Sequence, residues 1–217
     1  MTPYYDEDGI TIYHGDCRGV LPFVPADSLI LTDPPYGISH ASNRTAPTTT
    51  AEWMNTEIEN DGDTSLRDHA LAAFSDWACF GSLRAPPPSR VRGTLIWDKG
   101  PASGMGDLTF PWKTSYELIF ISGKGWTGHR DEGVIKGRHI VTRKSMGRVH
   151  PNEKPVDLMR YLAAKHPAEV ILDPFMGSGT TLVAAKLEGR KAIGIEIEEK
   201  YCEIAAKRLA QGVLDFG

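Results

Sequence analysis

The sequence contains few cysteines, and their placement excludes two kinds of site. Among 217 residues there are three cysteines, an odd number, and none belongs to a Cys-x-x-Cys pair. A disulfide framework and a zinc site are therefore not expected, and a reducing cytoplasm is the natural setting. The three positions are Cys17, Cys79 and Cys202.

Long hydrophobic runs are also missing. A membrane helix needs roughly 20 apolar residues, and no stretch of this chain approaches that length. The first eight residues are acidic and lack the apolar centre of a secretory signal. We therefore expect a cytoplasmic protein with no membrane partner and no bound metal.

What the sequence does have is the composition of a globular domain. Hydrophobic residues make up 41% of the chain and charged residues 24%, which is typical of soluble proteins. A chain of this length can bury a full core, so we expect one domain over residues 1–217.

Short β-rich runs alternate with helical patterns along the chain. Most of the runs are almost continuously apolar, as in strands buried on both faces, and the alternation predicts an α/β fold with a largely parallel sheet. The predicted strands are 10–13, 28–32, 94–97, 117–121, 169–172 and 192–197. The predicted helices carry their apolar stripes over 66–77, 155–162, 180–187 and 201–209.

Two segments depart from this alternation. Residues 39–60 are polar and non-periodic, and we expect a mobile loop that covers the substrate; a plain disordered insertion is the alternative. Residues 123–149 are basic, although the whole chain has a net charge of −4. A basic segment can bind phosphates, and a solvated loop is the simpler alternative. Its lysines and arginines are Lys124, Arg130, Lys136, Arg138, Arg143, Lys144 and Arg148.

The segment 173–181 indicates a cofactor loop between a strand and a helix. Gly177 and Gly179 permit close approach of a ligand to the backbone. The loop lacks the lysine of a triphosphate loop and the third glycine of the dinucleotide fingerprint, which favours a cofactor without phosphates. Glu196 follows Asp173 at the spacing of an acid that binds a ribose diol. Together these features fit S-adenosylmethionine, whereas a lone Gly-x-Gly would indicate an ordinary turn.

The segment Asp33-Pro34-Pro35-Tyr36 follows a predicted buried strand and is suited to holding an amine. The prolines stiffen the backbone, so the carboxylate of Asp33 and the carbonyl of Pro34 can act as paired acceptors for two N–H bonds. Tyr36 offers a flat face for a base. A rigid turn that caps a strand is the simpler alternative, but ligands of parallel sheets bind at this end of a strand.

These residues carry a specific resemblance. The chain resembles the S-adenosylmethionine-dependent DNA amino-methyltransferases that act on adenine N6 or cytosine N4. The catalytic motif precedes the cofactor motif, which is the permuted β order of that family. Asp33-Pro34-Pro35-Tyr36 matches the catalytic motif, and Asp-Pro-Phe-x-Gly-Ser-Gly-Thr-Thr at 173–181 matches the cofactor motif. The resemblance implies a Rossmann-like methyltransferase fold, circularly permuted, with a mostly parallel sheet flanked by helices.

The resemblance also implies roles for individual residues. Lys154, in a His-Pro-x-x-Lys-Pro element, corresponds to a position beside the methionine part of the cofactor, and Asp16 to an acid that approaches its adenine. Residues 117–120 correspond to a strand that lines the base pocket. The implied cofactor-binding set is Asp16, Lys154, Asp173, Phe175, Gly177, Ser178, Gly179, Thr180 and Glu196.

By position, 123–149 corresponds to the family's target-recognition segment, so the resemblance implies double-stranded DNA as the partner. The segment is short, which is consistent with a short target site or with help from a second subunit in a homodimer. Asp rather than Ser at the first catalytic position favours adenine N6, and cytosine N4 is the alternative.

Other classes fit less well. Cytosine-C5 methylation needs a cysteine beside a proline, and no cysteine here is followed by one. Protein- or RNA-directed amino-methyltransferases usually carry Asn-Pro-Pro-Tyr and place the cofactor motif first. A non-catalytic DNA-binding module that kept the fold is the alternative from another class, and the intact motifs argue against it.

The basic segment gives a first testable prediction. Replacing Arg138 and Arg143 by glutamine should weaken DNA binding and reduce the steepness of its salt dependence, because each phosphate contact releases counterions. Affinity measured over a series of salt concentrations tests this, and unchanged binding would refute the assignment of 123–149 as the recognition segment.

Overall fold

The structure is a computed structural model and describes residues 1–36, 62–100, 109, 111–136 and 154–211. The predicted loop 39–60 and four of the basic residues, Arg138, Arg143, Lys144 and Arg148, lie outside the described residues. No helix in the described ranges is both long and apolar enough to cross a membrane.

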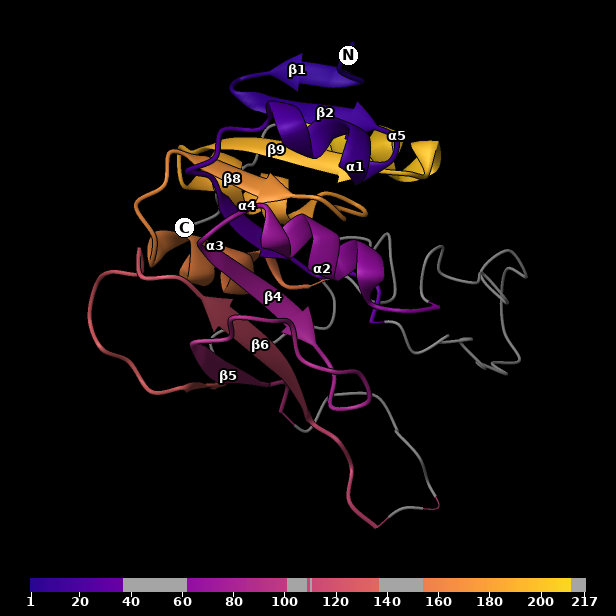
Figure 1. The fold of residues 1–217 in the computed structure, drawn as a ribbon. Helices are drawn as coiled ribbons and strands as arrows, with labels where there is room; N and C mark the ends of the chain where they lie inside the picture. Colours follow the sequence, from indigo (N-terminus) through magenta and orange to yellow (C-terminus); the bar gives the residue numbers. More distant parts are fainter. Residues whose placement is uncertain (37–61, 101–108, 110, 137–153, 212–217) are drawn as a thin grey trace.

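A mixed sheet forms the centre of the molecule (Figure 1). Its strands, in the described part of the chain, are ordered β1-β2-β9-β8-β3-β4-β6-β5-β7. Their bounds are β1 (Tyr5–Glu7), β2 (Ile10–His14), β3 (Leu29–Thr32), β4 (Trp77–Gly81), β5 (Gly93–Asp98), β6 (Tyr116–Ser122), β7 (Val134–Lys136), β8 (Val170–Asp173) and β9 (Lys191–Glu196).

Most strand pairs are parallel, as the sequence predicted. From β2 through β9, β8 and β3 to β4 every neighbouring pair is parallel, whereas β6 is antiparallel to both β4 and β5. Because β4 and β5 both oppose β6, they run in the same direction as each other. The strands β2, β9, β8, β3, β4 and β5 therefore all end at one edge, where β6 begins. We call this the carboxyl edge; the arrowheads of β2, β9, β8 and β4 point toward it in Figure 1.

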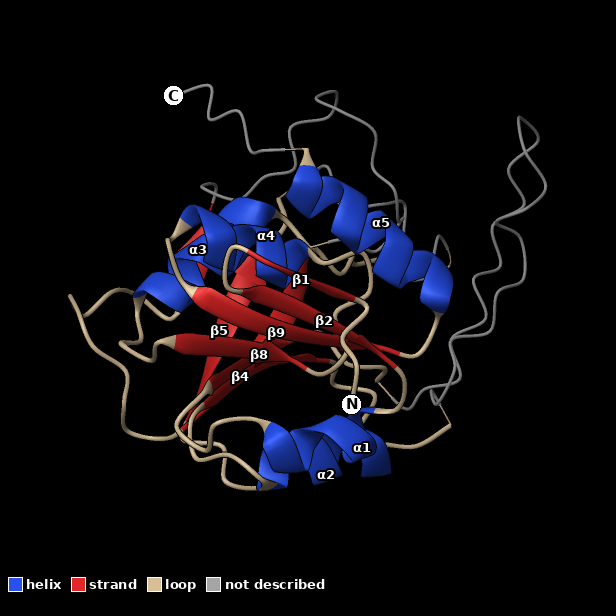
Figure 2. Cartoon of the chain, turned by 90° about the horizontal axis from the view of Figure 1, so that it is seen from above, coloured by secondary structure: helices blue, strands red, loops and turns tan. Residues whose placement is uncertain are grey.

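Helices cover both faces of the sheet (Figure 2). On one face lie α3 (Val156–Ala164), α4 (Thr180–Leu187) and α5 (Glu199–Ala210); on the other lie α1 (Cys17–Val20) and α2 (Ser65–Ala72). A short 3₁₀ helix, η1 (Leu21–Phe23), follows α1. The neighbours Ile30 and Leu31 are fully buried in different core clusters, because successive strand side chains point to opposite faces. The sheet is thus packed on both sides, which accounts for its apolar strands.

All six predicted strands are present, but one helix prediction was wrong. The apolar stripe that begins at Leu66 does not continue through Trp77, because α2 ends at Ala72 and Trp77–Gly81 forms strand β4. All five residues of β4 are buried between β3 and β6, so sheet pairing overrides the helical spacing. The short elements β1, β7 and α1 were not predicted. Pro155 is the N-cap of α3 rather than its first residue.

The packing of α4 on the sheet depends on Gly194 in β9. A Cβ built at this position would lie 2.4 Å from the sulfur of Met176 and 2.7 Å from a methyl carbon of Leu182, both buried. Gly194→Ala should therefore lower the free energy of unfolding by about 1–3 kcal/mol through overpacking. Denaturant unfolding measures this. Gly93→Ala in β5 is the matched control, since its Cβ would meet nothing within 4 Å; equal losses at both positions would contradict the packing argument.

Candidate active site

The predicted cofactor loop leads from β8 into α4 at the carboxyl edge. Gly177 has a φ of +50° and Gly179 a φ of +82°, which L side chains rarely adopt. A Cβ at Gly177 would meet nothing within 4 Å, whereas one at Gly179 would lie 2.7 Å from the Cβ of Ala205 in α5. The loop is therefore open to a ligand at Gly177 and pressed against the protein at Gly179.

Asp173 anchors this loop from inside the core. Its side chain is only 3% exposed, and its carboxylate accepts hydrogen bonds from the hydroxyls of Thr32 (2.6 Å) and Thr181 (2.5 Å). The backbone N–H of Phe175 also donates to it, at 3.2 Å. These donors are neutral, and burial raises the pKa of Asp173 to about 6. Asp173 thus fixes the strand, the loop and the first turn of α4 relative to β3.

Glu196, at the end of β9, faces the same loop. One carboxylate oxygen accepts the N–H of Gly177 and the other accepts that of Glu198, each at 2.9 Å. Each oxygen keeps a further lone pair, so the carboxylate can still accept hydrogen bonds from a diol. Burial raises the pKa of Glu196 above its ordinary value, even though these backbone bonds oppose the shift. The predicted ribose acid and the glycine loop are therefore adjacent.

Arg208 of α5 holds the loop from the other side and was missed by the sequence analysis. Its guanidinium donates to the carbonyl of Ser178 at 2.7 Å and to the hydroxyl of Ser178 at 3.1 Å. Ser178 and Thr180 are both buried. An arginine in an amphipathic helix 30 residues downstream carries no sequence signal for this contact, since any exposed helix face has such residues.

Asp16 lies two residues beyond β2, whose last residue pairs with Glu196. It is the N-cap of α1, and its carboxylate is bound by the backbone N–H and the guanidinium of Arg18. A cavity of about 240 Å³ next to this pair is lined by Arg18, Gly62, Asp63, Ser65 and Leu66. The structure thus places the predicted adenine-binding acid one strand away from the predicted ribose-binding acid.

The second predicted motif begins where β3 ends. β3 lies next to β8, so Asp33 emerges beside Asp173 at the carboxyl edge. The carboxylate of Asp33 accepts a hydrogen bond from the hydroxyl of Tyr36 at 2.7 Å and one from the ammonium of Lys154 at 2.5 Å. Lys154 was expected beside the cofactor; the structure places its ammonium on Asp33.

A chain of alternating charges continues from Lys154. Its Nζ lies 3.1 Å from Oε2 of Glu117 in β6, and Oε1 of Glu117 accepts a hydrogen bond from Lys99 at 2.7 Å. Glu117 was expected in a strand that lines the base pocket, whereas Lys99 was not expected at this site. The reason is topological: Lys99 reaches this edge only because β5 runs parallel to β4 through the intervening antiparallel strand.

Burial and these ion pairs shift the proton affinities at the site. Burial raises the pKa of Asp33; the ammonium of Lys154 opposes this shift, and the charge of Glu117 adds to it. Burial also tends to raise the pKa of Glu117, but Lys154 and Lys99 together hold it below its ordinary value. Burial and the nearby carboxylates raise the pKa of Tyr36, so its hydroxyl stays protonated and donates to Asp33.

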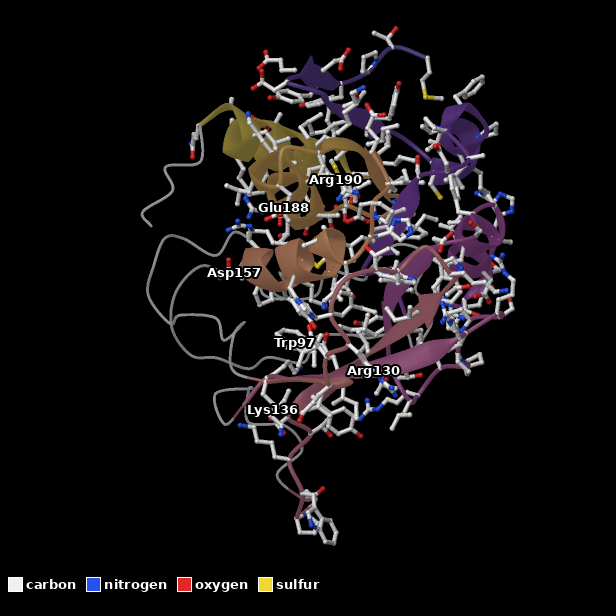
Figure 3. All side chains as sticks on the ribbon, turned by 90° about the vertical axis from the view of Figure 1, so that its left-hand side faces the viewer. Trp97, Arg130, Lys136, Asp157, Glu188 and Arg190 are labelled. Atoms are coloured by element: carbon white, nitrogen blue, oxygen red, sulfur yellow. The ribbon has the colours of Figure 1, made fainter. Side chains whose placement is uncertain are left out.

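The described part of the basic segment joins the two edges of the sheet. Lys124, Arg130 and Lys136 are all exposed, and Figure 3 shows Arg130 and Lys136 in the same half of the molecule as Trp97 of β5. Lys124 follows the end of β6, at the edge opposite the site. Lys136 ends β7, pairs with Asp98 and therefore lies at the carboxyl edge. Of these three residues, only Lys136 ends a strand at the carboxyl edge.

At the carboxyl edge of this sheet, the glycine loop and Glu196, the predicted ribose-binding acid, lie beside the Asp-Pro-Pro-Tyr turn. This arrangement defines a Rossmann-like methyltransferase fold. Two solved structures share it: the M1.HpyAVI–SAM complex (TM-score 0.61, 23% identity, covering 92% of this chain and 99% of that one) and the cytosine-N4-specific PvuII DNA methyltransferase (TM-score 0.62, 16% identity, covering 100% and 90%).

The family is identified by sequence. The profile of the DNA methylase family, which comprises the N6 and N4 amino-methyltransferases, matches residues 95–207. The methylase-family protein YubD of Escherichia coli (strain K12) is 33% identical over 217 aligned residues, which cover 90% of this chain and 88% of YubD. The chain belongs to the DNA methylase family of adenine-N6 and cytosine-N4 methyltransferases.

The raised pKa of Asp173 gives a prediction about pH and stability. An unfolded aspartate titrates near pH 4, so between about pH 4 and 6 the folded protein binds more protons than the unfolded chain. This group therefore makes the free energy of unfolding fall as pH rises through that window, by roughly 3 kcal/mol. Asp173→Asn removes the titration.

The measurement is denaturant unfolding of both proteins at several pH values. The stability of the wild type relative to Asp173→Asn should fall between pH 4 and 6 and stay level above pH 7. A difference that does not change with pH would contradict the raised pKa.

Proposed function

We propose that this protein transfers a methyl group from S-adenosylmethionine to the exocyclic amine of a DNA base, with adenine N6 as the target. The observation that carries the proposal is the position of Asp33. Its carboxylate lies at the carboxyl edge on the strand next to the glycine loop, and the hydrogen bond from Thr32 to Asp173 ties the two motifs together.

The residues at the loop fit the cofactor. Glu196 has acceptor capacity left for the ribose hydroxyls, and Gly177 leaves room for the ligand to approach the backbone. Asp16 approaches the adenine of the cofactor in this proposal. Phe175, Ser178, Gly179 and Thr180 shape the loop, and Asp173 holds it in place. When bound, S-adenosylmethionine supplies an electrophilic methyl group on a sulfonium.

Asp33 acts on the amine. The lone pair of an exocyclic amine is delocalised into the base, which makes the nitrogen a poor nucleophile. Hydrogen bonds from its two N–H groups to Asp33 and to the carbonyl of Pro34 favour the tetrahedral nitrogen that forms as the methyl group arrives, so they stabilise the transition state more than the ground state. Pro35 stiffens the turn, and Tyr36 offers the ring on which the base stacks. A base inside a duplex has to be flipped out to reach this position.

Double-stranded DNA approaches along the carboxyl edge. Lys136 and Arg130 are exposed cations of the recognition segment, and Arg138, Arg143, Lys144 and Arg148 follow Lys136 directly in the sequence. Such side chains bind phosphates and position the duplex. Lys124 lies at the opposite edge, about a seven-residue strand away, or roughly 20 Å. Of the three described basic residues of this segment, Lys124 is therefore the one that we least expect to contact DNA.

The choice between bases rests on Asp33 at the first position of the motif, which favours adenine over cytosine. The same pair of acceptors can hold the amine of cytosine, so cytosine N4 is the second candidate. Mass spectrometry of nucleosides from DNA of a methylation-free host that expresses this chain distinguishes N6-methyladenine from N4-methylcytosine. Neither modified base would be present if the protein were a non-catalytic DNA-binding module.

The variant Asp33→Ala tests whether methyl transfer and cofactor binding depend on different residues. The variant should lose methyl transfer by at least about 100-fold, because a carboxylate that stabilises the transition state is removed. Cofactor affinity should stay within about threefold, since Asp33 is not among the cofactor residues and Lys154 keeps Glu117 as a partner. Radiolabelled methyl transfer and calorimetric binding of the cofactor measure the two effects. Loss of both together would refute this division of roles.

A further inference from the structure

In this structure the carboxylate of Asp33 already holds a hydroxyl group and a cation. One carboxylate oxygen accepts a hydrogen bond from Tyr36, and the other accepts the ammonium of Lys154 at 2.5 Å. An ammonium this close neutralises much of the charge that would attract the amine. An arriving base therefore competes with Lys154 for Asp33.

Glu117 offers a second place for the same ammonium. Its Oε2 lies 3.1 Å from Nζ of Lys154, yet it is buried and has no well-aligned hydrogen bond within the described residues. The ammonium of Lys154 thus lies between two carboxylates, closer to that of Asp33 than to that of Glu117.

The surroundings allow the ammonium to move without moving the backbone. The backbone at Lys154 is held by Pro155, which caps α3. Nζ lies 5.0 Å from the ring centre of Phe80 and 6.0 Å from that of Tyr36, so aromatic faces attract the cation on its way. Rotation about the side-chain bonds of Lys154 is enough to exchange one carboxylate for the other. Glu117 itself is held by Lys99 at 2.7 Å.

We propose that Lys154 is a placeholder for the target amine: it occupies Asp33 until the base binds and then passes to Glu117, which makes Glu117 a positioning residue of the reaction. The inference rests on the proposed function and adds to it.

The exchange prepares Asp33 for the chemistry. Once Lys154 lies on Glu117, Oδ2 of Asp33 is free to accept an N–H of the amine, while the hydroxyl of Tyr36 stays on Oδ1. The amine lone pair forms the N–CH₃ bond as the S–CH₃ bond breaks, and the electron pair of that bond stays on sulfur, which becomes a neutral thioether. The nitrogen becomes positive and gives its proton to Asp33. The groups that face Asp33 and influence this step are Lys154, Glu117, Tyr36, Asp173 and Cys79.

A double-mutant cycle tests the exchange. In the wild type, Glu117→Gln should lower kcat/KM for DNA by about 10- to 100-fold, because Lys154 loses the charged partner that draws it away from Asp33. In a Lys154→Met protein the same change should alter kcat/KM by less than about threefold. Lys154→Met should also move the acid limb of the kcat/KM profile to higher pH, since Asp33 loses its cation.

A second measurement needs no change at Lys154. DNA that carries purine instead of adenine at the target position lacks the amine and cannot displace the ammonium. Glu117→Gln should therefore weaken binding of adenine-containing DNA by about tenfold and leave binding of purine-containing DNA unchanged. Glu169→Gln is the matched control, because Glu169 is an exposed partner of Lys191 at the opposite edge; it should behave as the wild type does.

The results of these two experiments distinguish the placeholder role of Lys154 from a purely structural role of Glu117. Equal losses from Glu117→Gln in both backgrounds, or with both DNAs, would overturn the placeholder and would mean that Glu117 only shapes the pocket. Loss of cofactor binding in Glu117→Gln would likewise overturn it. Absence of methyl transfer by the wild type would overturn the proposed function itself, and with it the placeholder. If the wild type transfers methyl groups but the effects of Glu117→Gln and Lys154→Met are independent, only the placeholder is overturned.

Discussion

The arrangement of the site depends on one buried carboxylate, that of Asp173. It accepts hydrogen bonds from Thr32 at the end of β3 and from Thr181 in the first turn of α4. It therefore joins β3 to β8 and α4, which follow about 140 residues later in the chain. Because the group is buried and its partners are neutral, any relative shift of these elements would leave it unsatisfied. The hydrogen bonds of this one group therefore hold the glycine loop and the turn at Asp33 next to each other.

Beside this anchor, four charged side chains form a chain of ion pairs at the carboxyl edge. Asp33, Lys154, Glu117 and Lys99 alternate in sign and come from four different parts of the fold. Such a chain tolerates burial better than isolated charges do, since each ion has an opposite neighbour. It also leaves Oε2 of Glu117 farther from the ammonium than Oδ2 of Asp33 is, and the proposed exchange of Lys154 rests on this asymmetry.

Much of the site was predictable because its signals are local. The strand–glycine–helix pattern at 170–187, the acid at Glu196 and the turn at Asp33 each appear within a few residues, and the structure brings all three to one edge. The helix predicted through Trp77 was wrong, because hydrophobic spacing alone does not distinguish a helix that continues from a buried strand that follows it. Short edge strands such as β7 had no distinctive pattern.

The sequence by itself determined the chemistry that the chain carries: an acidic turn suited to an amine, a glycine loop suited to a cofactor, and their permuted order. The tertiary structure alone decided which cations serve those acids. Lys99 reaches Glu117, and Glu117 reaches the ammonium of Lys154 beside Asp33, because β6 runs antiparallel between β4 and β5. Arg208 reaches the loop because α5 packs against it. Local propensities do not encode such contacts, since they depend on the order and direction of strands that are distant in the chain.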